Sequence, residues 1–466
     1  MIGGTILLLA VLFVGTAAVY FLRRFEPLAA LLAGAISLAS AVELWRSSLT
    51  VPISIAGRPV WIGEPFAWQD LTLTITAAAR ALLVFLLVAA GVTFLLAWRT
   101  HQGRTFYPFA LALVALWAMV ALLHPLTLAP LALVLASILS VFLIQAGRAG
   151  DTRGAWRQML FPSLALPLFL IAAWYIDQAP LNPSDQAPYR IAGWLLVAGF
   201  VFLLQPAPLH VAMPAVARKA PPVVAAFLWI GSQSTTLYLL QRFMVTYPWL
   251  ATTVDSARWL LWLGVFTAIT GGLMAAVQDS LGSFAGYAAV YDYGILLVAM
   301  ALRSTAGVPI VIWLLITRTI AMLTLATGIA MLRHHMESDR FENLAGAASR
   351  LPWATAALVM GGFALAGLPL TAQFASRWAL LQVVAGADVR WVIVLALGAL
   401  GVLAGTLRAG RACFGTLRNS PVQREPLLLA VLVFVLLAAG VMLGLFPQLL
   451  AGAVAVAIVP LSSIEP

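Results

Sequence analysis

Hydrophobic stretches of about 20 residues, each long enough to cross a hydrocarbon core of about 30 Å as an α-helix, recur along almost the whole chain. Backbone groups inside a bilayer have no water to bind, so a spanning segment must satisfy its hydrogen bonds within a helix. The sequence therefore predicts an all-α polytopic membrane protein, a single transmembrane domain over residues 1–466 with about 14 transmembrane helices. The predicted spans are residues 2–22, 27–45, 74–98, 106–123, 126–146, 158–176, 190–211, 221–245, 257–277, 284–302, 306–331, 351–388, 391–411 and 426–448.

The composition favours a membrane protein over a soluble one. Hydrophobic residues make up 63% of the chain and charged residues 9%, whereas a soluble domain carries about 25% charged residues. The first stretch starts at Ile2 without a basic segment or a small-residue cleavage site, so we expect a first span rather than a signal peptide. Cys413 is the single cysteine, which excludes an internal disulfide and a multi-cysteine metal site.

The net charge of +10 could indicate nucleic-acid binding, but no basic run is long enough for that. We therefore interpret the excess positive charge as loop arginines that set the orientation in the membrane. Loops after even-numbered spans hold far fewer, such as Arg58, Arg190, Arg258 and Arg390. Loops after odd-numbered spans hold many more: Arg23, Arg24, Arg99, Arg104, Arg148, Arg153, Arg157, Arg218, Lys219, Arg333, Arg340, Arg350, Arg418 and Arg424. The positive-inside rule then predicts cytoplasmic odd-numbered loops and both termini on the periplasmic side of a bacterial plasma membrane.

Two of the predicted spans contain residues that interrupt helices. The seventh runs into Pro206, Pro208 and Pro214, and the twelfth contains Gly367 and Pro369. Proline removes a helical hydrogen bond, so the unwound backbone must be buried in protein or line a wet cavity. Plain proline kinks are the alternative interpretation.

Broken helices at corresponding places in two halves are typical of transporters built from inverted repeats. This pattern divides the chain into four parts. They are N-terminal helices in residues 1–105, a first repeat in 106–245, a second repeat in 257–388 and C-terminal helices in 391–466.

Five segments occur in the order of the motifs of one membrane-protein family. The chain resembles the antiporter-like membrane subunits of respiratory complex I, which are related to Mrp-type cation antiporters and membrane-bound hydrogenase subunits. The resemblance covers nearly the whole chain, and the lack of a long lateral helix after the last span is similar to the shorter M- or N-type subunits. The segments are Pro208–Pro214 with Ala220–Val223, Gly231–Phe243, Gln278–Gly294, Asp339–Gly346 and Leu365–Ala372.

In this family, function is implied to rest on ionisable residues near mid-membrane. A charge in hydrocarbon is costly, so it persists where it carries protons or has a partner. Here the positions that match the family's fifth-helix glutamate and seventh-helix lysine are Ser137 and Leu203. Ser234 matches its eighth-helix lysine, and Gly282 matches the lysine that opens the family segment resembled by Gln278–Gly294. We therefore expect poor or no proton conduction through the first half of this chain, which would then serve as a scaffold.

Four titratable or charged residues remain as candidates for a proton path or gate. Arg377 matches the family's terminal lysine, and Arg318 lies near its eleventh-helix histidine or lysine. Asp292 takes a tenth-helix position usually held by histidine or glutamine, and His210 lies at the seventh-helix break. Arginine is a poor proton carrier because its pKa stays above about 12. Structural roles, as ion pairs or as a cap on unwound backbone, are the alternatives.

No phosphate-binding loop, metal-ligand cluster or nucleophile with a matching base occurs in the sequence, so no cofactor is expected and any redox chemistry would belong to partner subunits. The resemblance implies a membrane-arm subunit of a complex I-like NADH:quinone oxidoreductase, with proton translocation coupled to quinone reduction. One alternative is a subunit of a related hydrogenase, Mrp antiporter or inorganic-carbon uptake complex. A stand-alone secondary transporter is another, with a polar site at Ser232, Gln233, Ser234, Thr235 and Gln373.

Overall fold

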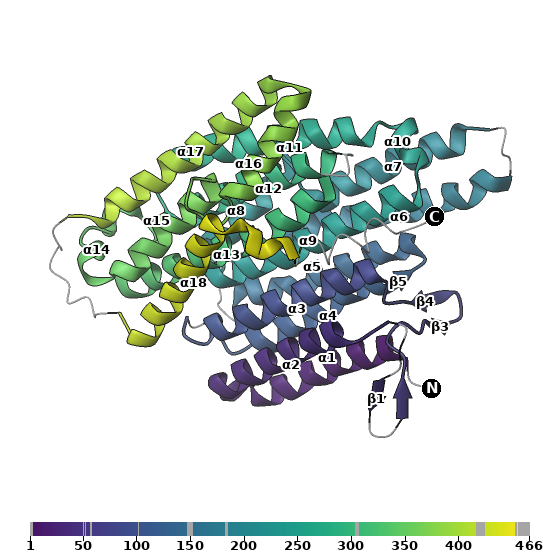
Figure 1. The fold of residues 1–466 in the computed structure, drawn as a ribbon, viewed down its shortest axis with the longest axis horizontal. Helices are drawn as coiled ribbons and strands as arrows, with labels where there is room; N and C mark the ends of the chain where they lie inside the picture. Colours follow the sequence, from purple (N-terminus) through teal and green to yellow (C-terminus); the bar gives the residue numbers. More distant parts are fainter. Residues whose placement is uncertain are drawn as a thin grey trace.

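The computed structural model describes residues 3–49, 51, 53–55, 58–100, 102–146, 152–181, 185–302, 307–415, 425–452 and 454. Figure 1 shows helices packed side by side, from α1 and α2 at one edge to α16 and α17 at the other. The helices are α1 (Gly4–Phe21), α2 (Glu26–Arg46), α3 (Ala77–Ala97), α4 (Phe106–Leu122), α5 (Ala129–Gln145), α6 (Arg153–Gln178), α7 (Ala187–Leu204), α8 (Ala212–Lys219), α9 (Pro222–Thr246), α10 (Trp249–Thr253), α11 (Ser256–Ala276), α12 (Leu281–Ala301), α13 (Gly307–Met336), α14 (Ala347–Arg350), α15 (Pro352–Ala366), α16 (Phe374–Ala387), α17 (Val389–Cys413) and α18 (Leu427–Leu445).

Twelve helical segments in the described part of the chain are long and apolar enough to cross a membrane. With the two shorter apolar helices α4 and α15, they match the predicted spans one for one. The protein is a multi-pass membrane protein, as the length of its hydrophobic stretches predicted. Of the loop arginines used for the orientation, Arg148, Arg418 and Arg424 lie outside the described residues.

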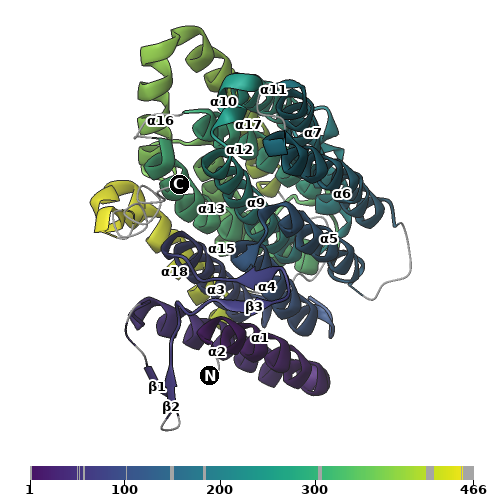
Figure 2. The ribbon, with the colours of Figure 1, turned by 90° about the vertical axis from the view of Figure 1, so that its right-hand side faces the viewer.

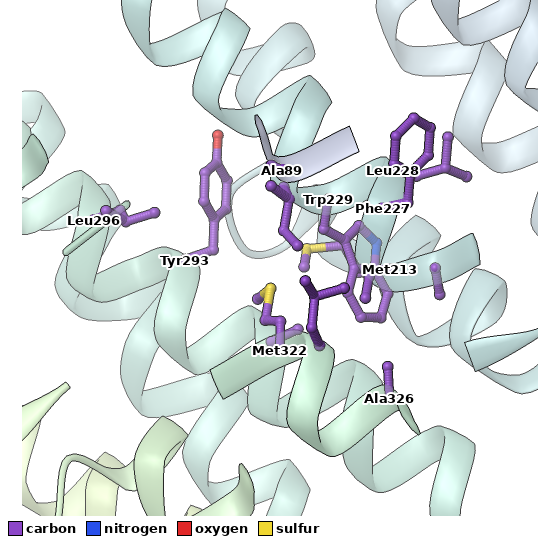
Figure 3. Close-up of a cluster of buried hydrophobic side chains, with 14 of the residues drawn as sticks. Ala89, Met213, Phe227, Leu228, Trp229, Tyr293, Leu296, Met322 and Ala326 are labelled. Atoms are coloured by element: carbon purple, nitrogen blue, oxygen red, sulfur yellow. The ribbon is translucent and has the colours of Figure 1, made fainter. Parts of the chain in front are cut away.

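Helices α9 and α12 form the interior of the bundle, with 89% and 83% of their spans buried, against 22% for α18. Figure 3 shows Met213 of α8, Trp229 of α9, Tyr293 of α12 and Met322 of α13 around this common core. Figure 2 shows α18 at the outside of the bundle. Most side chains on α9 and α12 therefore face other helices rather than the outer surface of the bundle.

Glycines let α12 pack closely against α11. A Cβ atom at Gly294 would lie 2.4 Å from the backbone nitrogen of Ala268, and one at Gly271 would lie 2.3 Å from that of Tyr291. Small residues at such a contact allow the close backbone approach that drives helix association in a membrane. This contact fixes the position of α12, which carries Asp292.

Both predicted helix breaks are present. The first separates α7 from α8 at residues 205–211 and starts with Gln205 in the left-handed conformation, φ 48°. The second separates α15 from α16 at residues 367–373, where Gly367 has φ 80°. Pro208 lies in the first break, and Gly367 and Pro369 lie in the second.

The prediction that Pro214 breaks a helix is wrong. Pro214 is the third residue of α8. The nitrogens of a first helical turn have no partner within the helix, so a proline there costs no helical hydrogen bond.

Five short strands lie together at one end of the bundle (Figure 1) and were not predicted. They are β1 (Ile53–Ile55), β2 (Arg58–Val60), β3 (Phe66–Trp68), β4 (Leu71–Leu73) and β5 (Leu123–His124). β1 and β2 form an antiparallel pair, and β3, β4 and β5 form an antiparallel sheet in the order β3-β4-β5. This sheet attaches the connection between α2 and α3 to the residues after α4, with Thr72 opposite His124.

Candidate functional site

Three charged side chains from three helices meet in the interior of the second half. Asp292 of α12 accepts a hydrogen bond from Arg318 Nε of α13 at 2.7 Å, through Oδ2. Its other oxygen, Oδ1, accepts one from Arg377 Nη2 of α16 at 2.6 Å. The three side chains are buried, with exposed fractions of 1%, 1% and 4%. Three of the four predicted candidates therefore form one ion-pair cluster.

Two glutamines extend this cluster on either side. Arg318 Nη2 donates to Gln233 Oε1 of α9 at 2.6 Å, and Arg377 Nε donates to Gln373 Oε1 at 2.6 Å. Arg377 also lies 5.0 Å from the ring centroid of Tyr291, a cation–π distance. Two guanidinium groups and one carboxylate leave a formal charge of +1. The amide oxygens and the aromatic ring help to compensate it in a medium where an isolated charge costs about 3 kcal/mol or more.

Three donors of the cluster have no partner among the described residues: Arg318 Nη1, Arg377 Nη1 and Gln373 Nε2. A buried donor without a partner costs about 1–3 kcal/mol. Such groups are normally satisfied by ordered water. The geometry therefore calls for water molecules at the cluster.

The second helix break gives Arg377 its path to Asp292. α15 ends at Ala366, and the left-handed Gly367 that follows has no side chain on the face where Arg377 passes. A Cβ atom at Gly367 would lie 2.4 Å from Arg377 Cδ. The break thus serves two purposes, because it ends a helix and makes room for a charged side chain.

His210, the fourth candidate, is not part of this cluster. It lies in the first break, between α7 and α8, where it is half-buried. Its ring centroid lies 6.1 Å from that of Tyr287 on α12. Among the described residues, no recorded hydrogen bond or ion pair joins it to Asp292, Arg318 or Arg377.

Residues 176–403 match the family described as NADH:quinone oxidoreductase/Mrp antiporter, transmembrane region. The subunit N of NADH-quinone oxidoreductase from Nitrosomonas europaea is 26% identical over 395 residues, 80% of this chain and 81% of that protein. The chain is therefore similar to the antiporter-like membrane subunits of this family. The subunits N from Methylococcus capsulatus and Geotalea uraniireducens are 30% and 28% identical over 58% and 42% of this chain. These two matches span about half of each relative, 56% and 42%.

Solved structures have the same fold over nearly the whole chain. A chain of the archaeal membrane-bound sulfane sulfur reductase superposes with a TM-score of 0.84 at 16% identity, covering 98% of this chain and 97% of its own. A chain of the Mrp complex from Dietzia gives 0.79 at 18% identity, with 98% of both chains covered. A chain of Thermus thermophilus respiratory complex I gives 0.74 at 23% identity, with 96% and 99% covered.

Two positions where the resemblance places a family glutamate and a family lysine, Ser137 and Leu203, line one small cavity of about 50 Å³ in the first half. Ser140, Gln205 and Gln233 are among its other lining residues. The cavity is large enough for a few water molecules, since one water needs roughly 10–15 Å³. Gln233 lines this cavity and also binds Arg318, so it links the neutral cavity of the first half to the charged cluster of the second half. Sequence reasoning named Gln233 only as part of a possible solute site.

At Gly282, the fourth neutral position, a cation is supplied by another helix. A Cβ atom there would lie 2.0 Å from Arg333 Nη2, so the guanidinium of α13 fills the space beside this glycine. Arg333 Nε donates to Asp339 Oδ1 at 2.6 Å, and Nη2 donates to the Ala217 carbonyl at the end of α8 at 3.0 Å. Asp339 Oδ1 also accepts from the Gly282 nitrogen at 3.1 Å. The sequence analysis used Arg333 only as one of the loop arginines that set membrane orientation. The signal that could have indicated its second role is Gly282, a glycine at a position where the family has a lysine.

Proposed function

We propose that this chain is a membrane-arm subunit of a complex I-like NADH:quinone oxidoreductase in a bacterial inner membrane, with both termini on the periplasmic side. The family match and the subunit N relatives support this assignment. Quinone reduction and its cofactors would belong to partner subunits. Within the chain, residues 106–245 and 257–388 would form the two inverted repeats, flanked by helices in 1–105 and 391–466.

We further propose that the first half of this subunit conducts no protons. The observation that carries this proposal is the neutral cavity, whose lining residues include no Asp, Glu, Lys, Arg or His. A proton relay needs a group that binds and releases a proton near the working pH. Serine, leucine and glutamine side chains do not, and the neighbouring Arg318 keeps its proton because arginine does not titrate at such pH values. The subunit would then act as a scaffold that transmits force or completes the membrane arm.

The second half would hold its charges in place rather than move them. Each oxygen of Asp292 is bound by a different arginine, and each arginine also binds a glutamine oxygen. Four such contacts across α9, α12, α13 and α16 favour a fixed arrangement. We propose that Asp292, Arg318 and Arg377 position these helices, and that His210 at the other break lines a hydrated region without completing a relay.

A related assembly is the second candidate. The archaeal sulfane sulfur reductase and Mrp chains give TM-scores of 0.84 and 0.79, against 0.74 for the Thermus complex I chain.

A stand-alone solute transporter has less support. Ser232, Ser234 and Thr235 each donate to a carbonyl four residues earlier in α9, which leaves their hydroxyl protons unavailable to a solute.

The test of the assignment is extraction of the native protein in a mild detergent, followed by mass spectrometry of the proteins that stay bound. We expect NADH:quinone oxidoreductase subunits. Hydrogenase, Mrp-type or carbon-uptake subunits would contradict the complex I assignment and support the related assembly. Recovery as a single protein would contradict both.

A further inference from the structure

A hollow much larger than the cavity in the first half lies between α3, α9 and α13. Its volume is about 520 Å³, and Leu436 of α18 and Leu450 border one edge. Figure 1 shows α3, α9, α13 and α18 next to one another. All four helices are long and apolar enough to cross a membrane, so this hollow lies at the depth of the bilayer.

The lining of the hollow is apolar. No lining residue is charged, and the polar ones are Ser234, Thr319, Tyr238 and Gln241, together with Trp45. The hydroxyl of Ser234 donates to Ile230 O at 2.6 Å, and that of Thr319 donates to Leu315 O at 2.8 Å. These two hydroxyl protons are therefore engaged within their own helices. Water in this hollow would find few partners, whereas a hydrocarbon chain would bury apolar surface.

The hollow has the depth of one membrane leaflet or more. On α3 its lining runs from Ala78 to Val92, a distance of about 21 Å at a rise of about 1.5 Å per residue. Half of a hydrocarbon core is about 15 Å. On α13 the lining runs from Val308 to Leu323, over nearly the same depth.

Polarity in the hollow changes along its length. Trp45, near the end of α2, and Gln241, near the end of α9, lie at the end where α3 begins, and tryptophan is typical of the membrane–water interface. The deeper part, toward Val92 and Leu323, is formed by aliphatic side chains together with Ser234 and Thr319, whose hydroxyl protons are engaged within their own helices. The hollow is thus more polar at the membrane surface and apolar over the depth of one leaflet. A phospholipid has the same distribution, with a polar head group and apolar acyl chains.

We propose that this hollow is a binding site for one membrane phospholipid, with an acyl chain between α3 and α13 and the head group beside Trp45 and Gln241. The lipid fills the gap between the N-terminal helices and the second half of the chain. This inference does not depend on which complex the subunit joins.

The test compares two matched double variants of the full-length protein. Val84→Phe with Val88→Phe fills the hollow from α3, and both positions line it. Val431→Phe with Val435→Phe makes the same change at the same spacing on the exposed surface of α18, outside the lining. Phospholipid retained per chain after detergent purification is counted by native mass spectrometry. We expect the first variant to lose one lipid that the wild type and the control retain; equal lipid counts in all three, or no retained lipid in the wild type, would overturn the proposal.

A second measurement does not depend on how well the variants fold. A photoreactive amino acid replaces Phe85, which lines the hollow. It is activated in native membranes, and the cross-linked product is identified by mass. We expect a phospholipid adduct. A cross-link to another protein would overturn the proposal and identify the hollow as a subunit interface.

Discussion

At the scale of single residues, the sequence indicated which charges lie inside the membrane but not how they pair. Asp292, Arg318 and Arg377 were each predicted as intramembrane candidates, with conduction and ion pairing left open. Their contact depends on the path of the backbone through the second break, which no local pattern encodes. Arg333 was missed for a similar reason, because its contact with Asp339 and the end of α8 depends on how distant helices pack.

Replacing Asp292 with asparagine leaves two buried arginines without a counter-charge. Removing one member of a buried ion pair costs about 3–5 kcal/mol, so we expect a marked fall in the thermal unfolding temperature of the purified protein. The control is Asp279→Asn, which breaks an exposed pair with Arg408. An exposed pair contributes about 1 kcal/mol or less, and equal effects of the two substitutions would contradict the buried cluster.

Gly282 and Arg333 are expected to be coupled. Gly282→Ala places a methyl group where the Arg333 guanidinium lies and should destabilise the protein. In an Arg333→Ala background, the same substitution should lower the free energy of unfolding by less, with a difference of about 0.5 kcal/mol or more. The four proteins of this cycle are compared by thermal unfolding in one detergent. Additive effects would show that Arg333 does not occupy the space beside Gly282.

His124 should make the stability depend on pH. Arg242 Nη2 lies 2.7 Å from His124 Nε2, a hydrogen bond that needs an unprotonated acceptor. Burial, and then the charge of Arg242, lower the pKa of His124 below its ordinary value of 6.5. The unfolded chain therefore takes up this proton first. The contribution of neutral His124 to the free energy of unfolding is complete above pH 6.5. It is lost as the pH falls from 6.5 toward the lowered pKa of the folded state.

The measurement is the unfolding temperature between pH 5 and 8 for the wild type and for His124→Gln. We expect the acid-dependent loss to be smaller in the variant. A pH profile that the substitution leaves unchanged would contradict the assigned interaction.

At the scale of elements, the helices and both breaks could be predicted because hydrophobic length and the Pro and Gly positions are local signals. Pro214 was misassigned because a proline in a first helical turn and one in a break are not distinguished by residue type alone. The strands were missed because segments of two or three residues carry no measurable alternation of hydrophobicity.

The second break can be tested at Gly367. Gly367→Ala meets two penalties, a positive φ and a Cβ atom 2.4 Å from Arg377 Cδ. A non-glycine residue in the left-handed region costs about 1–3 kcal/mol, so we expect a lower unfolding temperature. Gly386→Ala on α16 is the control, because its Cβ would meet no atom within 4 Å. Similar unfolding temperatures for both variants would contradict the described turn.

At the scale of the whole molecule, the fold was predictable and the partners were not. Hydrophobic spans are distributed over the entire chain, and complex I and Mrp chains of the same fold superpose over 96–98% of it. Ser137, Leu203 and Ser234, the positions where the resemblance places family charges, are neutral and buried within the bundle.

Proton flux through the reconstituted full-length protein tests the central claim most directly. Proteoliposomes carrying a pH-sensitive dye inside are given a membrane potential, and acidification is compared with that of protein-free vesicles. Because the first half has no titratable relay, we predict equal rates for the wild type and the empty vesicles. Flux above the empty-vesicle rate would contradict a non-conducting subunit, whether or not it persists in Arg377→Ala and His210→Ala.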